Sequence, residues 1–245
     1  MDLEQCESEG VKTRNELLRF LCAVYDPVST LSEKNGKTAL VMRNKTLGRE
    51  MVTRSLPEEL PVYDFLCLHR QKNLLEVRDV LKAGDGVIVL EEYIRGVSVA
   101  EVLKNGLYTY KGAAKVLLAL CDALEILHEN GFIHRDIKPG NVMISDEGVV
   151  KLVDFDASRQ FDAGKERDTT HLGTVGYAAP EQYGVMQSGP RSDIYALGVL
   201  LNVMLTGCHP SRQLAPGKAG RIVVRCTQIN PSLRFESVEE LRKKL

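Results

Sequence analysis

The segment HRDIKPGN, residues 134–141, combines an acid, a base and an amide in one short polar stretch. Asp136 could accept a proton from a hydroxyl group, and Lys138 could neutralise a phosphoryl group during its transfer. Asn141 and Asp154 offer an amide oxygen and a carboxylate, which are the kinds of oxygen ligand that Mg²⁺ binds. Each residue alone could equally belong to a solvated polar loop, but the spacing of the whole set favours a site for phosphoryl transfer.

The hydrophobic pattern changes along the chain. Short β-like runs dominate the first part: TALVM from Thr38, EMVTRSL from Glu50 and GVIVLEEY from Gly86. Later, apolar residues recur at helical spacing from Ala113 to Leu127, and short strands and further helical segments follow. The sequence therefore predicts an α+β, bilobal chain. We expect a small β-rich lobe with one helix, a larger, mainly helical lobe, and a cleft between the two.

We predict three segments along this chain. Residues 1–25 form an N-terminal helical extension, because Thr13-x-x-Glu16 is a capping-box pattern that precedes leucines at helical spacing. Residues 26–94 form the β-rich lobe and residues 95–245 form the helical lobe. The two lobes together are expected to make one domain.

Composition excludes several classes of protein. The 245 residues are 44% hydrophobic and 27% charged, which is typical of a soluble globular protein. The net charge of −1 argues against nucleic acid or a membrane surface as a partner. The start MDLEQCESEG is too acidic for a signal peptide, and Asn202 interrupts the longest apolar run, so no membrane segment is expected. Six cysteines without CxxC spacing favour reduced thiols and a cytoplasmic protein.

Further motifs follow HRDIKPGN in a definite order. DFD stands at 154–156, GTVGYAAPEQ at 173–182 and SDIYALGVLL at 192–201. Over essentially its whole length, the sequence resembles a protein kinase of the bacterial, eukaryotic-like serine/threonine type. The resemblance implies a bilobal kinase fold in which Arg234, in NPSLRF, pairs with Glu181.

The resemblance also implies a role for each residue of the site. Asp136 would be the catalytic base, Lys138 would neutralise the γ-phosphoryl group of ATP, and Thr174 would orient both. Asn141 and Asp154 would hold Mg²⁺. The implied reaction transfers the γ-phosphoryl group of ATP to a serine or threonine hydroxyl of a protein substrate.

Other residues would support this site. The resemblance implies that His134 and Phe155 pack into the interior and that Asp193 holds the backbone of the catalytic loop. Thr169 and Thr170 lie in the implied activation segment and are candidates for phosphorylation.

The first lobe departs from the family pattern. The implied glycine-rich loop falls on residues 31–38, where only Gly36 remains, and Lys37 is an alternative ligand for phosphate. Arg54 stands where the family has a lysine that binds phosphate, and the position of that lysine's glutamate partner falls on or near Val62.

We hypothesise that Glu91 pairs with Arg54 instead. The residues expected to contact the nucleotide are Gly36, Lys37, Arg54, Glu91, Glu92, Tyr93 and Ile94. Asp156 replaces the glycine of the family's DFG motif, so we expect either a stiffer left-handed turn there or an ordinary turn residue that faces solvent. The stretch from Gly207 to Gly217 is too short for the extra helix that the family usually has after its central helix.

Three functions fit these observations. An active ATP- and Mg²⁺-dependent serine/threonine kinase is favoured, because the whole catalytic set of the helical lobe is present. A pseudokinase that binds a nucleotide or a partner without transfer is the alternative that the altered first lobe supports. A small-molecule kinase fits less well, because such enzymes lack a segment like GTVGYAAPE.

Overall fold

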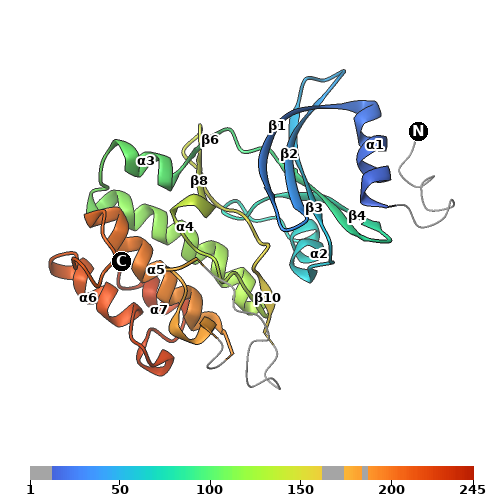
Figure 1. Ribbon diagram of the computed structural model, residues 1–245. Coiled ribbons are helices and arrows are strands. Elements are labelled where there is room, and N and C mark those ends of the chain that lie inside the picture. Colours follow the sequence, from blue (N-terminus) through green and yellow to red (C-terminus); the bar gives the residue numbers. More distant parts are fainter. Residues whose placement is uncertain (1–12, 162–173, 184–186) are drawn as a thin grey trace. The chain divides into compact units, whose positions relative to one another are not determined.

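The computed structural model describes residues 13–161, 174–183 and 187–245 and divides into two compact units (Figure 1). One unit comprises the chain up to Arg70 together with Leu75–Ile94, and the other comprises Gln71–Leu74 and the chain from Arg95. The first unit is built around a β-sheet and the second mainly from helices, so the predicted α+β class is confirmed.

The first unit contains a five-stranded antiparallel sheet in the order β1-β2-β3-β5-β4. Its elements are α1 (Arg14–Val24), β1 (Tyr25–Lys34), β2 (Lys37–Asn44), β3 (Glu50–Leu56), α2 (Pro61–Leu68), β4 (Val77–Ala83) and β5 (Gly86–Glu92). Strands β2, β3 and β5 match the three predicted runs. Strands β1 and β4 were not predicted. Nearly all side chains of β1 are exposed and those of β4 are mostly half-buried, so neither strand has a clear alternating pattern in the sequence.

Helix α1 lies beside the sheet of this unit, as Figure 1 shows. It begins at the predicted capping box, in which Thr13 Oγ1 accepts the N–H of Glu16 and the Glu16 carboxylate accepts the N–H of Thr13. Leu17 and Leu21 are buried against strand residues of the sheet. This apolar cluster consists of Leu17, Leu21, Met42, Met51, Ile88 and Leu90.

The second unit is organised around two long helices, α4 (Tyr110–Glu129) and α5 (Pro190–Thr206). Its other helices are α3 (Val99–Asn105), α6 (Gly217–Cys226) and α7 (Val238–Arg242), with short 3₁₀ turns η2 (Pro139–Asn141), η3 (Pro180–Tyr183) and η4 (Pro231–Leu233). Strands β6 (Gly96–Ser98), β8 (Val142–Ser145) and β9 (Val150–Leu152) form one small sheet, and β7 (Phe132–Ile133) pairs with β10 (Arg159–Gln160). The predicted apolar face of α4 is buried.

Helix α5 contains the longest apolar run of the sequence, and most of its residues are buried inside the second unit. Among the residues that the structure describes, no helix has both the length and the apolar character needed to cross a bilayer. Residues 207–216, between α5 and α6, form turns and irregular chain, as the short spacing there predicts.

Candidate active site

The loop that carries Asp136 is held by a buried aspartate of α5. Asp193 accepts hydrogen bonds from the backbone N–H groups of His134 (3.0 Å) and Arg135 (2.9 Å), as the resemblance implied. Arg135 has a φ angle of 69°, and its carbonyl group accepts a hydrogen bond from Gln182 Nε2 (2.8 Å). Both backbone groups of this left-handed residue are therefore bonded, which offsets the cost of its conformation.

Asp193 stays ionised although it is fully buried. Burial alone would raise the pKa of its carboxyl group. The hydrogen bond from His128 Nε2 (2.8 Å) and the backbone N–H of His134 outweigh burial and lower this pKa below its ordinary value of 3.8. The charged side chain therefore remains a strong acceptor for the loop backbone at neutral pH.

Four predicted catalytic residues meet in one hydrogen-bonded cluster. Asp136 Oδ1 accepts the hydroxyl (2.6 Å) and the backbone N–H (3.1 Å) of Thr174. Asp136 Oδ2 accepts Lys138 Nζ (2.6 Å) and Asn141 Nδ2 (3.0 Å), and Lys138 Nζ also donates to Thr174 Oγ1 (2.9 Å). Each carboxylate oxygen thus has two donors, which fix the orientation of Asp136. The catalytic roles themselves stay predictions.

His134 connects the catalytic loop with the DFD segment. Its Nδ1 lies 3.3 Å from the N–H of Asp136, and its Nε2 lies 3.2 Å from the carbonyl oxygen of Val153. Nδ1 must then accept and Nε2 must donate, which describes a neutral ring. Burial lowers the pKa of His134 below 6.5 although neighbouring aspartates oppose it, in agreement with this assignment. The ring also packs edge-on against the buried Phe155, with centroids 4.9 Å apart.

The two predicted Mg²⁺ ligands lie on adjacent chain segments. The N–H of Val153 donates to the carbonyl oxygen of Asn141 (3.0 Å), which places Asn141 beside the residue that precedes Asp154. Asn141 Nδ2 donates to the backbone and carboxylate oxygens of Asp136 (2.9 and 3.0 Å), so the amide oxygen is directed away from Asp136.

This donor set fits Mg²⁺. One amide oxygen and one carboxylate are typical of sites in which substrate phosphates and water complete the coordination. Within the described parts of the chain, no three His, Cys, Asp or Glu side chains are grouped so that they could hold a metal ion by themselves. A Mg²⁺ ion at Asn141 and Asp154 would therefore take its remaining ligands from phosphate oxygens and water.

Asp156 is a turn residue, as one alternative predicted, but the left-handed conformation expected for it is wrong. The residue with positive φ in this segment is Asp154 (64°), and Asp156 does not share that conformation. A turn closed by the bond from Ser158 N–H to Phe155 C=O (2.9 Å) takes Asp156 as its second residue, a position that tolerates most side chains. Aspartate therefore replaces glycine at Asp156 without strain, and the conformational cost lies at the predicted metal ligand.

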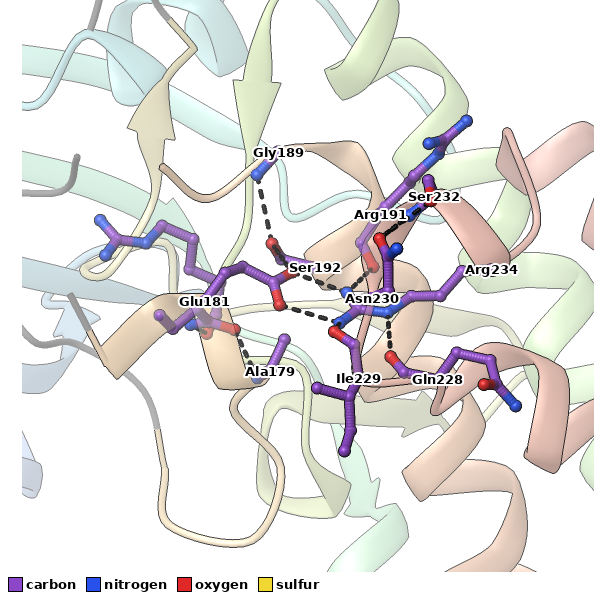
Figure 2. Close-up of polar contacts among 12 residues, drawn as sticks. Ala179, Glu181, Gly189, Arg191, Ser192, Gln228, Ile229, Asn230, Ser232 and Arg234 are labelled. Atoms are coloured by element: carbon purple, nitrogen blue, oxygen red, sulfur yellow. Dashed lines mark hydrogen bonds and ion pairs between the residues drawn. The ribbon is translucent and has the colours of Figure 1, made fainter. Parts of the chain in front are cut away.

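A buried ion pair anchors the segment that follows Thr174 (Figure 2). Arg234 Nη1 and Nη2 donate to Glu181 Oε1 (2.6 Å) and Oε2 (2.8 Å), so the pair that the resemblance implied is present. Ser192 Oγ donates to the same carboxylate (2.7 Å) from the first turn of α5. Thr169 and Thr170, the predicted phosphorylation sites, lie outside the described residues.

The hypothesised pair of Arg54 and Glu91 is present in the first unit. Arg54 Nε lies 2.7 Å from Glu91 Oε1, and Nη2 lies 3.4 Å from Oε2. The two residues are diagonal neighbours on paired strands, because Arg54 faces Val89 and Val52 faces Glu91 in the register of β3 and β5. The side chains are 12% and 3% exposed, so the pair is largely shielded from water.

The other predicted nucleotide residues occupy different positions in this unit. Gly36 belongs to the two-residue turn between β1 and β2, and Lys37 opens β2. Glu92 ends β5, where its Oε1 accepts the N–H of Glu76 (2.7 Å). The remaining two, Tyr93 and Ile94, directly follow that strand. The structure shows no nucleotide contact for this set, which therefore stays a prediction.

Sequence reasoning missed several residues that hold the site. Gln182 bonds the carbonyl group of Arg135, Ser192 bonds Glu181, and His128 bonds Asp193. Gln182 and Ser192 fall inside segments that were recognised as motifs, but their partners are distant in sequence and only the fold identifies them.

Comparison with known proteins agrees with this geometry. Residues 30–244 match the family described as "Protein kinase domain". The chain is 40% identical over 126 residues to the probable serine/threonine-protein kinase PknB of Bifidobacterium longum. The aligned region covers 50% of this chain and 18% of that protein. It is 34% identical over 172 residues to a probable serine/threonine-protein kinase of Clostridium perfringens, covering 69% of this chain and 25% of that protein.

A third relative is the serine/threonine-protein kinase PknB of Mycobacterium tuberculosis, with 38% identity over 160 residues, or 64% of this chain and 26% of that protein. The matched regions thus span about a quarter or less of these relatives. Because the family match covers most of the sequence, and because the order and contacts of the motifs agree with it, the chain belongs to the protein kinase family.

Proposed function

We propose that this chain is an ATP- and Mg²⁺-dependent serine/threonine protein kinase. The observation that carries the proposal is the cluster in which Thr174 and Lys138 both bond the carboxylate of Asp136. This arrangement sets an oriented carboxylate, the proposed base, beside a cation, as the attack of an alcohol on a phosphoryl group would require. The names of the similar bacterial proteins support the same reaction class.

In this mechanism, the chain's own residues orient the reactants and move one proton. The substrate hydroxyl gives its proton to the carboxylate of Asp136, its oxygen forms the new bond to the γ-phosphorus, and the bond to ADP breaks. Lys138 stabilises the charge on the transferring group, and Thr174 keeps Asp136 and Lys138 in place. A Mg²⁺ ion held by Asn141 and Asp154 would neutralise charge on the phosphate oxygens.

A radiolabel transfer assay tests this proposal. Purified chain is incubated with γ-labelled ATP and Mg²⁺, with casein as a generic acceptor, and label on the chain and on casein is measured. Asp136→Asn should reduce the transfer rate at least 10²–10³-fold, which is the usual cost of removing one preorganised group from an active site. The exposed acid Asp146 supplies the matched control, since Asp146→Asn should leave transfer unchanged. Equal labelling of the wild type and Asp136→Asn would contradict the assignment of the base.

Thr174 allows a finer test of the same cluster. Thr174→Ser keeps a hydroxyl donor and should retain most of the transfer rate, whereas Thr174→Val should lose about 10- to 100-fold, the value of one hydrogen bond to a charged group. Equal rates for the two variants would mean that the bond from Thr174 Oγ1 to Asp136 is not used.

A pseudokinase is the second candidate, and the pair of Arg54 and Glu91 favours it. The guanidinium group of Arg54 is directed to a buried carboxylate within the sheet, whereas the family uses a lysine at this position for phosphate. This reading predicts a thermal shift on addition of ATP without any transfer of label. Glu91→Gln should weaken ATP binding if the pair orients Arg54, and an unchanged affinity would exclude that role.

We also propose a reducing, cytoplasmic location. The support is that the five cysteines in the described part of the chain are all free thiols, and that Cys121 and Cys226 are buried. Burial raises the pKa of the Cys121 thiol to about 12, so this residue is unreactive and acts as a packing group. Alkylation of the native protein with a membrane-impermeant reagent should therefore leave both buried thiols unmodified.

A further inference from the structure

The turn between β1 and β2 lies where the family has its glycine-rich loop. The two turn residues, Asn35 and Gly36, have φ angles of 53° and 73°, which are the left-handed values of a tight two-residue hairpin. Lys34 and Lys37 form the last pair of the ladder before the turn. This segment is therefore a short, closed hairpin tip and not a wide glycine loop.

Little packing holds this hairpin tip in place. All residues of β1 after Tyr25 are exposed, and the register of β1 against β2 shifts at two points. A strand with so little buried surface gains little free energy from the hydrophobic effect. Beyond the backbone ladder with β2, the position of the tip therefore depends on polar contacts of side chains.

Arg14 supplies such contacts from another part of the sequence. Arg14 Nη1 donates to the carbonyl oxygen of Gly36 (3.1 Å) and to Ser55 Oγ, at the end of β3 (3.3 Å). Arg14 Nε lies 3.3 Å from Asp85 Oδ2, in the turn between β4 and β5, and the Arg14 backbone N–H donates to Asp85 Oδ1 (2.7 Å). Arg14 is the first residue of α1, so its N–H has no acceptor within the helix, and Asp85 provides one.

The ion pair orients the guanidinium group toward the hairpin. The Arg14 side chain is only 18% exposed, although Asp85 remains 44% exposed. The N–H of Arg14 lowers the pKa of Asp85, with a further contribution from the guanidinium group, so the carboxylate is charged at neutral pH. Asp85 therefore fixes the backbone N–H and the Nε of Arg14, and Nη1 of the same guanidinium group donates to Gly36 and Ser55.

We propose that Arg14 is a positioning residue for nucleotide binding, which it supports by fixing the β1–β2 turn to the sheet through α1. The inference rests on the nucleotide-binding part of the proposed function. Arg14 itself would not touch the nucleotide. Because the turn would face the phosphates, a loss of Arg14 should weaken the binding of ATP but not that of adenosine.

Calorimetric titration of the whole chain with ATP–Mg²⁺ and with adenosine tests this inference. Arg14→Ala should weaken ATP binding about tenfold, the order expected for one hydrogen bond from a charged group, and should change adenosine binding by less than about twofold. Arg19, exposed on the same helix, supplies the control, since Arg19→Ala should bind both as the wild type does. Asp85→Asn, which loses the charge that orients Arg14, should weaken ATP binding in the same selective way but by less.

The outcomes separate this inference from the proposed function. If the wild type binds ATP but Arg14→Ala keeps the wild-type ratio of ATP to adenosine affinity, the role of Arg14 is overturned and the proposed function stands. If the wild type binds neither compound, the nucleotide-binding function fails and the inference fails with it. If Arg14→Ala does not give a cooperative melting transition, Asp85→Asn decides, and an unchanged ratio in that variant overturns the inference.

Discussion

Replacing Arg234 with methionine should strongly destabilise the second unit. The guanidinium group has five N–H donors, and all five are used. Two donate to the carboxylate of Glu181 (2.6 and 2.8 Å), and the others donate to the carbonyl oxygens of Gln228 (2.8 Å), Arg191 (2.9 Å) and Ile229 (3.2 Å). Figure 2 shows these bonds meeting at the one side chain. Methionine keeps much of the packing volume but satisfies none of the acceptors.

The size of the effect follows from burial. The Arg234 and Glu181 side chains are 0% and 3% exposed, so Arg234→Met leaves a carboxylate in a dry site. Removing one partner of such a pair costs about 3–5 kcal/mol, and the remaining bond from Ser192 Oγ to Glu181 (2.7 Å) favours the lower part of this range. At about 2–4 °C per kcal/mol for a chain of this size, the melting temperature should fall by about 6–20 °C.

A double-mutant cycle measures the pair directly. Urea denaturation and thermal melting are compared for the wild type, Arg234→Met, Glu181→Met and the double variant. The double variant should recover most of the loss, since it leaves no unpaired charge. As a control, Arg43 pairs with Glu50 at 2.8 Å but is 53% exposed, so Arg43→Met should cost at most about 1 kcal/mol. A loss below about 1 kcal/mol for Arg234→Met, or additive losses in the double variant, would show that the unpaired buried carboxylate does not cause the destabilisation.

Three further predictions concern stability. Gly198→Ala should lower the melting temperature although alanine favours helices, because the new methyl group would lie 2.3 Å from Cys226 Cβ. Gly112→Ala, whose new methyl group would have contacts of 3.4 Å, should be neutral or stabilising. Equal effects of the two substitutions would contradict the predicted clash at Gly198. Thr53→Val should raise the unfolding free energy by about 1 kcal/mol, because the buried Thr53 hydroxyl has no hydrogen-bond partner; a lower urea midpoint would contradict this. Burial lowers the pKa of His134 in the folded state, so its contribution to stability is complete above pH 6.5 and is lost as the pH falls below that value, where the unfolded chain binds the proton more readily. The drop in urea midpoint between about pH 7.5 and about pH 5.5 should therefore be smaller in His134→Asn than in the wild type. An equal drop in the two proteins would exclude His134 as its source.

Much of the second unit could be predicted from its sequence. Segments 134–141, 154–156 and 173–182 contain three motifs of the kinase family in the family's order, and this combination is specific. Their implied contacts are present: Thr174 bonds Asp136, and Arg234 bonds Glu181. The long helix α4 was equally predictable, because its strong 3.6-residue hydrophobic period can be read from the local sequence alone.

The first unit was less predictable, because part of its sheet has exposed side chains on both faces. Strand β1 has almost no buried side chains, so no alternating pattern marks it in the sequence. The departure of Arg54 from the family pattern suggests that it has a new partner, but only the register of β3 against β5 makes Arg54 and Glu91 neighbours.

Local patterns and the spacing of motifs were enough to predict the α+β class and the protein kinase family, and they supplied the residues proposed for phosphoryl transfer. Other features can be identified only in the folded chain. Arg14 reaches Asp85 across 71 residues, Asp154 and not Asp156 takes the left-handed conformation, and the methyl group that Gly198 lacks would collide with α6. Each depends on the packing of distant segments, and interactions between residues far apart in the chain leave no local period for sequence analysis to detect.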